Sequence, residues 1–198
     1  MRLIAFILTL LPTIALSEVS YDEETSTLRI TGATDMVQVI KASNYMTEEE
    51  VQYIEMWGPG GYMKMGFQLG NRISQEETAT VVIPKGKKCI SACAFAAMGS
   101  GHVRIDGKLM LHRPYIRAAP IMERLEDILA YMGKGYIQTA YYLEDHGYSR
   151  SIMRSLMDST SPCKFMVYEG KEVKDPSELT LWHLDDTRCV MLKRRIQR

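Results

Sequence analysis

The sequence lacks a surplus of charge of either sign. Lys and Arg together number 24, and so do Asp and Glu, which gives a formal net charge of +0 over 198 residues. A chain without a basic surplus has no general electrostatic attraction for nucleic acid or anionic lipid. The sequence therefore predicts no nucleic-acid partner.

Cysteine and histidine are also scarce, at four residues each. Neither a Cys-x-x-Cys pair nor a His-x-x-x-His pair occurs, so the common ligand spacings of zinc sites are absent and we expect neither a metal nor another cofactor. Four cysteines permit three disulfide pairings in an oxidising compartment. We prefer 89 with 93 and 163 with 189, because the second bridge would pin the C-terminal segment. The alternative is that the first two are buried free thiols. The candidate disulfide residues are Cys89, Cys93, Cys163 and Cys189.

Long apolar runs are missing except at the start of the chain. Arg2 is followed by a mostly apolar run over residues 3–11 and then by Ala-Leu-Ser at 15–17, which fits the small-x-small rule of signal peptidase. An uncleaved membrane anchor is the competing interpretation, but the run is shorter than the about 20 residues of a membrane span. We predict a signal peptide over residues 1–17 and a single secreted or periplasmic domain over 18–198, with no stable membrane span after cleavage.

The remaining sequence alternates between strand-like and helix-like segments. Such alternation favours an α/β fold with a largely parallel sheet. A break in the last helix is expected at Gly133 and Gly135. The expected strands are 27–32, 50–57, 78–84, 102–105 and 108–112, and the expected helices are 35–46, 62–73, 92–98 and 120–146.

Two features fall where the expected strands end, which is where sites lie in parallel sheets. The first is GPGG at 58–61, and the second is Ser91, between two cysteines in CISACAFAAMG at the start of an alanine-rich helix. A serine in this place can act as a nucleophile if a base such as His112, in KLMLHRP, takes its proton. The alternatives are that Ser91 is an ordinary helix cap, that GPGG is a turn and that His112 is a structural residue.

Three motifs in order resemble the Clp-type protease and crotonase superfamily: GPGGYMKMGFQLGNRI, CISACAFAAMGSG and KLMLHRP. The chain is most similar to secreted or periplasmic Clp-protease-like proteins with a Cys-x-Ser-Ala-Cys core, over about residues 28–115. The resemblance implies a Clp/crotonase-like superhelix of repeated ββα units, formed by a Clp-protease-like domain. It also implies assembly of a homo-oligomer through the helix at 120–146.

The resemblance implies a role for each site residue. Ser91 would be the nucleophile and His112 the general base, with the amides of Gly61 and Ala92 as the oxyanion hole. Gly60 and Met63 would line the substrate groove, and Asp158 is the best-placed third acid, with Glu144, Asp145 and Asp185 as alternatives. Gly58 stands where the family usually has serine, and the surroundings of Asp158 depart from the family's pattern.

The sequence thus predicts a serine endopeptidase that hydrolyses peptide bonds of a peptide or protein substrate through an acyl-enzyme. The alternative is a catalytically inactive module of the same fold that binds peptides or a partner protein. A crotonase-like acyl-CoA enzyme is disfavoured, because an exported chain meets no supply of coenzyme A.

Overall fold

The computed structural model describes residues 17–112, 125–148, 152, 154, 156, 164–169 and 180–183. Its helices are α1 (Met36–Glu48), α2 (Met63–Ile73), α3 (Ala92–Ala97) and α4 (Leu125–Asp145). Its strands are β1 (Glu18–Asp22), β2 (Thr27–Thr34), β3 (Tyr53–Gly61), β4 (Thr80–Ile83), β5 (Lys88–Ile90), β6 (Val103–Ile105), β7 (Lys108–Leu111), β8 (Lys164–Glu169) and β9 (Thr180–His183).

The sheet is largely parallel, as expected. Its main path runs β1-β2-β3-β5-β7-β8-β9, with β4 paired to β3 and β6 paired to β4. The pairs β2–β3, β3–β4, β3–β5, β4–β6 and β5–β7 are parallel. Among the described strands, only the pairs β1–β2, β7–β8 and β8–β9 are antiparallel.

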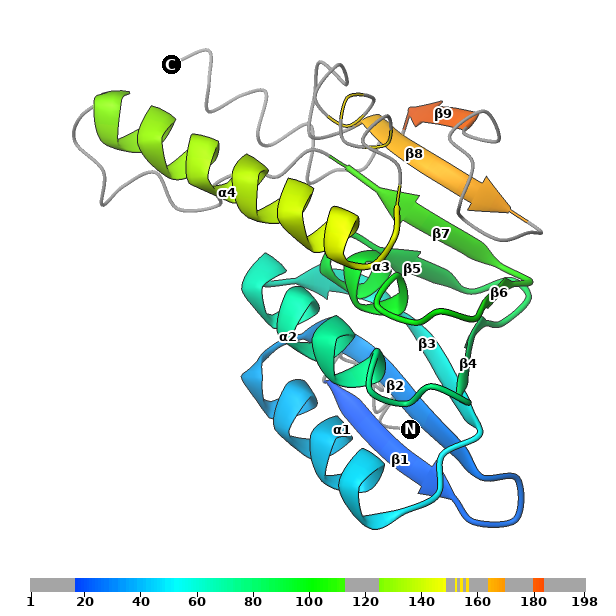
Figure 1. Cartoon of the computed structure of the whole chain (residues 1–198). Helices are drawn as coiled ribbons and strands as arrows, with labels where there is room; N and C mark the ends of the chain where they lie inside the picture. The colour runs from blue at the N-terminus through cyan, green and yellow to red at the C-terminus, as the bar shows by residue number, and fades with distance from the viewer. Residues whose placement is uncertain are drawn as a thin grey trace, which may run out of the picture.

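Strand β3 serves two branches of the sheet. Its first part pairs with β4 from Tyr53 to Glu55, and further on Gly58 pairs with Cys89 of β5. The chain crosses between the branches twice, from β4 to β5 before α3 and from β6 to β7 before α4. This repetition of two strands and a helix is the ββα organisation predicted from the sequence, and Figure 1 shows it in the green part of the ribbon.

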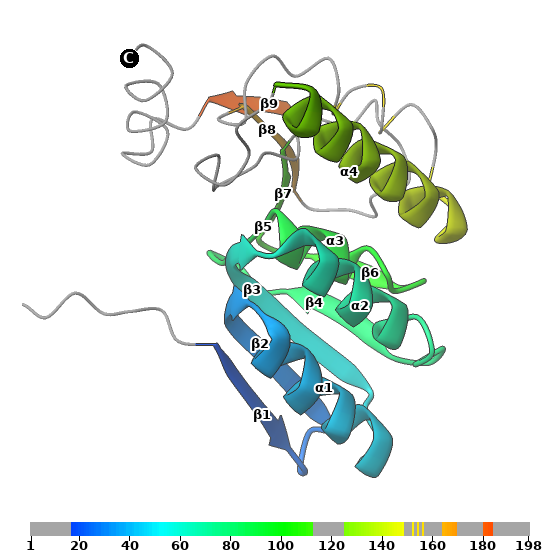
Figure 2. The same cartoon turned by 90° about the vertical axis from the view of Figure 1, so that its left-hand side faces the viewer.

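Helices α1, α2 and α3 lie side by side along one face of the sheet (Figures 1 and 2). The strands send alternate side chains toward them, as the pleat of a strand requires. The core therefore contains Leu28 and Ile30 of β2, Ile54 and Met56 of β3, and Val81 and Ile83 of β4, all buried.

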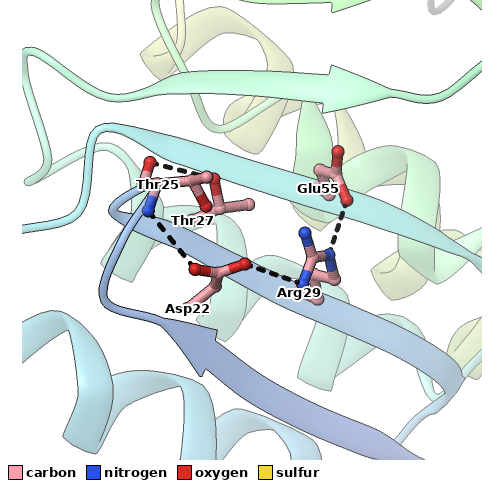
Figure 3. Close-up of polar contacts among 5 residues, drawn as sticks. All are labelled: Asp22, Thr25, Thr27, Arg29 and Glu55. Atoms are coloured by element: carbon pink, nitrogen blue, oxygen red, sulfur yellow. Dashed lines mark hydrogen bonds and ion pairs between the residues drawn. The ribbon is translucent and has the colours of Figure 1, made fainter.

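The residues between these core positions form polar contacts on the other side of the strands (Figure 3). Arg29 donates from Nε to Glu55 Oε2 at 3.0 Å and from Nη1 to Asp22 Oδ2 at 3.4 Å. The backbone N–H of Thr25 also donates to Asp22, at 3.3 Å. That N–H, together with Arg29, lowers the pKa of Asp22 below its ordinary value.

Helix α4 packs on α2 and α3 through an aromatic cluster. The Tyr142 hydroxyl donates to the Phe95 carbonyl at 2.7 Å, and its ring stacks on Phe67 with 4.5 Å between centroids. Burial raises the pKa of Tyr142 well above its usual range. Three residues before Tyr142, Thr139 Oγ1 donates to the Gly135 carbonyl at 2.8 Å and also lies 3.6 Å from the Met63 sulfur.

Four details differ from the sequence expectations. The first strand of the structure, β1, was not expected, and neither was β5, so Ser91 follows β5 and not β4. Strand β3 does not stop before GPGG but continues through it to Gly61. The break expected in α4 is wrong, because the helix continues through Gly133 and Gly135. Among the described residues, no helix is long and apolar enough to cross a membrane.

Candidate functional site

Ser91 stands at the junction of β5 and α3 in a strained backbone conformation. Its φ is 58° and its ψ is −118°, and in the described part of the chain only Ser26 shares a positive φ among non-glycine residues. Such a conformation costs on the order of 1–3 kcal/mol and persists only where the surroundings impose it.

Both backbone polar groups of Ser91 are held by hydrogen bonds. Its N–H donates to the carbonyl of Met110 in β7 at 2.8 Å, and its carbonyl accepts the first helical bond, from the Phe95 N–H, at 3.0 Å. Its side chain makes no capping hydrogen bond to α3. Ser91 is the N-cap residue of α3 by position, but the side-chain hydrogen bond of an ordinary helix cap is absent from this structure.

Gly60 and Gly66 press directly against this junction. A methyl group on Gly60, whose φ is 81°, would lie 2.8 Å from Ser91 Cβ and 3.0 Å from Ala92 N, and would collide with the Ile90 carbonyl oxygen. A methyl group on Gly66 would lie 3.0 Å from Ala92 Cα. Only glycine fits at either position, so β3 and α2 both contact the junction through bare backbone.

Gly61 and Ala92 carry the two backbone N–H groups expected to form the oxyanion hole. The Tyr62 N–H donates to the Thr34 carbonyl of β2 at 3.0 Å, and Gly61 is the register partner of Thr34. Because backbone groups alternate along a strand, the Gly61 N–H points away from β2. The Ala92 N–H belongs to the first turn of α3, where helical N–H groups have no partner within the helix.

His112 lies at the same edge of the sheet. It directly follows β7 and comes two residues after Met110, the residue whose carbonyl binds the Ser91 N–H. Its side chain is buried, with 6% of its surface exposed. The structure thus brings Ser91, His112 and the Gly60–Gly61 pair together at the carboxyl ends of β5, β7 and β3.

Two of the four candidate acids lie outside the described residues, and the other two lie at the C-terminal end of α4. The two outside are Asp158 and the alternative Asp185, and Cys163 and Cys189 lie outside as well. Helix α4 passes Met63 at Gly135 and contacts Phe67 of α2 and Phe95 of α3 at Tyr142. Glu144 and Asp145 follow Tyr142 at the C-terminal end of α4 and are exposed.

A disulfide joins Cys89 and Cys93 across Ser91, with 5.2 Å between the two Cα atoms. Both residues are buried, at 0% and 3% exposure. The pairing preferred from the sequence is present for these two cysteines, and the alternative of two free thiols is wrong.

Sequence reasoning missed the contact of Gly66 with the junction. The signal was available, because Gly66 and Gly70 are four residues apart and so share a face of α2. The helix that follows in the chain is rich in alanine. Small residues on two facing helices indicate a close approach of their backbones.

The comparisons with known proteins reach no further than the backbone. No family model and no curated protein matches the sequence. Among solved structures, a mutant of ClpP1 from Listeria monocytogenes is similar, with a TM-score of 0.47 and 17% sequence identity, over 67% of this chain and 78% of that one. The chemistry of the site therefore has to be inferred from this chain's own residues.

Proposed function

We propose that the protein is a serine hydrolase whose nucleophile is Ser91. The observation that carries this proposal is the strained backbone of Ser91 at a strand-to-helix junction, together with a hydroxyl that does not cap the helix. A sharp strand-to-helix turn of this kind is how α/β hydrolases expose a nucleophilic serine, and strain of this kind is typical of functional sites.

In the proposed reaction His112 takes the proton from Ser91 Oγ as the oxygen attacks a substrate carbonyl carbon. The resulting oxyanion accepts hydrogen bonds from the N–H groups of Ala92 and Gly61. His112 then returns the proton to the leaving amine, which leaves an acyl group on Ser91. Water, activated by His112, hydrolyses this ester and regenerates the serine. Asp158 is proposed to orient the imidazole.

The proposed substrate class is a peptide or protein, bound along Gly60 and Met63. This choice comes from the resemblance of the three sequence motifs to Clp-type proteases. Residues 1–17 are proposed to direct the chain to the periplasm or the outside of the cell, and the 18–198 domain to act there as a homo-oligomer. Edman sequencing of the exported protein should begin at Glu18, and an exported chain that begins at Met1 would contradict cleavage.

The decisive experiment is covalent labelling with a fluorophosphonate, followed by mass spectrometry of the labelled peptide. The wild-type protein should be labelled at Ser91, and Ser91→Ala and His112→Ala should each lose the label while circular dichroism stays native. Ser26→Ala is the matched control, because it replaces the other strained serine of the described chain. It should retain the label.

The loss of labelling rate in Ser91→Ala and the loss in His112→Ala should not add, because each residue acts only together with the other. The double variant should therefore resemble each single variant in its labelling rate. A folded wild-type protein that takes no label, or a label that persists in Ser91→Ala, would favour the inactive peptide-binding module.

A further inference from the structure

The Cys89–Cys93 disulfide closes a five-residue ring that contains both Ser91 and Ala92. Cys89 belongs to β5 and Cys93 to the first turn of α3, so the bridge ties the end of the strand to the start of the helix. The ring encloses the proposed nucleophile and one of the two proposed oxyanion donors.

Helix α3 has few features of its own that would determine the residue at which it begins. It has six residues, and isolated helices shorter than about 12–15 residues are marginal in water. Serine is among the best N-cap residues, because its hydroxyl can accept from the second or third N–H of the helix. Ser91 does not use its side chain in this way. The stabilisation that a cap would normally give α3 therefore has to come from another source.

Relaxation of Ser91 would remove its proposed function. Released from a positive φ, a serine at this position would adopt the extended conformation of an ordinary N-cap residue, and its hydroxyl would bind the N–H of Cys93 or Ala94. A hydroxyl committed to the helix is turned away from the substrate. The two conformations of Ser91, strained and capping, are therefore alternatives.

We propose that the Cys89–Cys93 disulfide is the positioning element that selects the strained conformation of Ser91, so that the site assembles only in the oxidised chain. The inference rests on the proposed function of Ser91. Contacts from Gly60 and Met110 hold the junction from outside, but the disulfide is the covalent link across it. A chain still in a reducing cytosol would then carry an idle nucleophile until export and oxidation.

The redox step is a two-electron exchange. Dithiothreitol attacks the bridge through one thiolate, forms a mixed disulfide, and closes to its cyclic disulfide through the second. Cys89 and Cys93 each gain one proton and share the two electrons, and the reagent loses the same number of electrons. Because both cysteines are buried, reduction is carried out in urea and the chain is refolded in the presence of the reductant.

The test measures the fluorophosphonate reaction as two constants, the inactivation rate kinact and the binding constant KI. Reduced wild-type protein and the Cys89→Ala, Cys93→Ala double variant should both fold, and kinact should fall about tenfold or more because the nucleophile is misplaced. KI should change by less than about twofold, because the binding surface remains. Reoxidation should restore kinact in the wild-type protein.

Two controls separate positioning from general destabilisation. Arg72→Ala removes contacts to Glu76 and to the Met46 carbonyl at the far end of α2, so it lowers stability at a distance from Ser91 and should keep kinact. Dithiothreitol should leave kinact of the double variant unchanged. If the alanine pair does not fold, Cys89→Val with Cys93→Ala fills more of the buried space.

The outcomes distinguish this proposal from the one on which it rests. A reduced, folded protein with the kinact of the oxidised protein would overturn the positioning role and leave Ser91 as the nucleophile. A loss of kinact in the double variant on reduction would assign the effect to other cysteines and overturn it as well. An oxidised wild-type protein that takes no label would overturn both proposals.

Discussion

Replacing Gly60 by alanine should be among the most damaging single-methyl changes in the chain. Gly60 has a φ of 81°, and a left-handed conformation costs a non-glycine residue about 1–2 kcal/mol. The added methyl would also meet the Ile90 carbonyl oxygen, Ser91 Cβ and Ala92 N, which are parts of rigid elements. Overpacking of this kind costs about 1–3 kcal/mol. The sum predicts a loss of about 2–5 kcal/mol in the free energy of unfolding.

Gly86→Ala is the matched control for this prediction. Gly86 has a φ of 77°, almost that of Gly60, but a methyl group there would have no heavy atom within 4 Å. Gly86→Ala should therefore show the cost of the backbone conformation alone, about 1–2 kcal/mol. Urea unfolding followed by circular dichroism measures both values, and equal m-values would show that the denatured states are comparable.

The difference between the two variants isolates the contact with the Ser91 junction. It should amount to about 1–3 kcal/mol, and kinact for the fluorophosphonate should fall in Gly60→Ala but not in Gly86→Ala. A difference below about 0.5 kcal/mol, within the usual error of such comparisons, would refute the close approach of β3 to the junction.

Three further predictions concern other parts of the molecule. Tyr142→Phe should lower stability by about 1–2 kcal/mol with an unchanged m-value, since the buried Phe95 carbonyl loses its donor; no loss in urea unfolding would contradict that bond. The native contacts of Asp22 depress its pKa, so their stabilisation is present above the unfolded pKa and is lost as the pH falls through the folded pKa. The stability advantage of the wild-type protein over Asp22→Asn should therefore shrink on acidification below about pH 4, and an advantage independent of pH would contradict it. Thiol titration of the denatured, unreduced mature protein should find no free cysteine, and two reactive thiols would show that the predicted 163–189 bridge is absent.

The sequence was sufficient for most of the fold, because strand-like and helix-like segments alternate along it. The strand-like segment at 27–32 predicted β2, and the aromatic and β-branched residues of 50–57 before a glycine cluster predicted most of β3. Strand β5 was missed, since Lys-Cys-Ile is too short to show a period and follows a lysine-rich loop. The break predicted in α4 failed because glycine propensity is weak beside tertiary packing: Gly135 lies against Met63, where a methyl group would be 3.6 Å from its Cε.

The sequence predicted which strand ends meet at the candidate site, but not the geometry of the chain there. The order of GPGG, Ser91 and His112 along the chain indicated three strand ends that meet at one edge. The positive φ of Ser91 could not be predicted, because no local preference favours it for serine. Gly60 and Met110, which are distant in sequence, contact the junction from outside, and the Cys89–Cys93 disulfide, which we propose selects the conformation, bridges it. Only the folded chain brings these contacts together.

The close approach of α2 to the junction means that the same residue type has opposite value at different places in this chain. Gly66 acts as a spacer: any larger residue would push α2 away from Ala92, so an engineer has no freedom there. Gly133, in contrast, lies within α4 with open space around it and without a positive φ. No contact requires glycine at this position, and alanine loses less conformational entropy on folding. Gly133→Ala should therefore raise stability by about 0.5–1 kcal/mol. Robustness can therefore be added to this protein along α4, while the packing around Ser91 is left untouched.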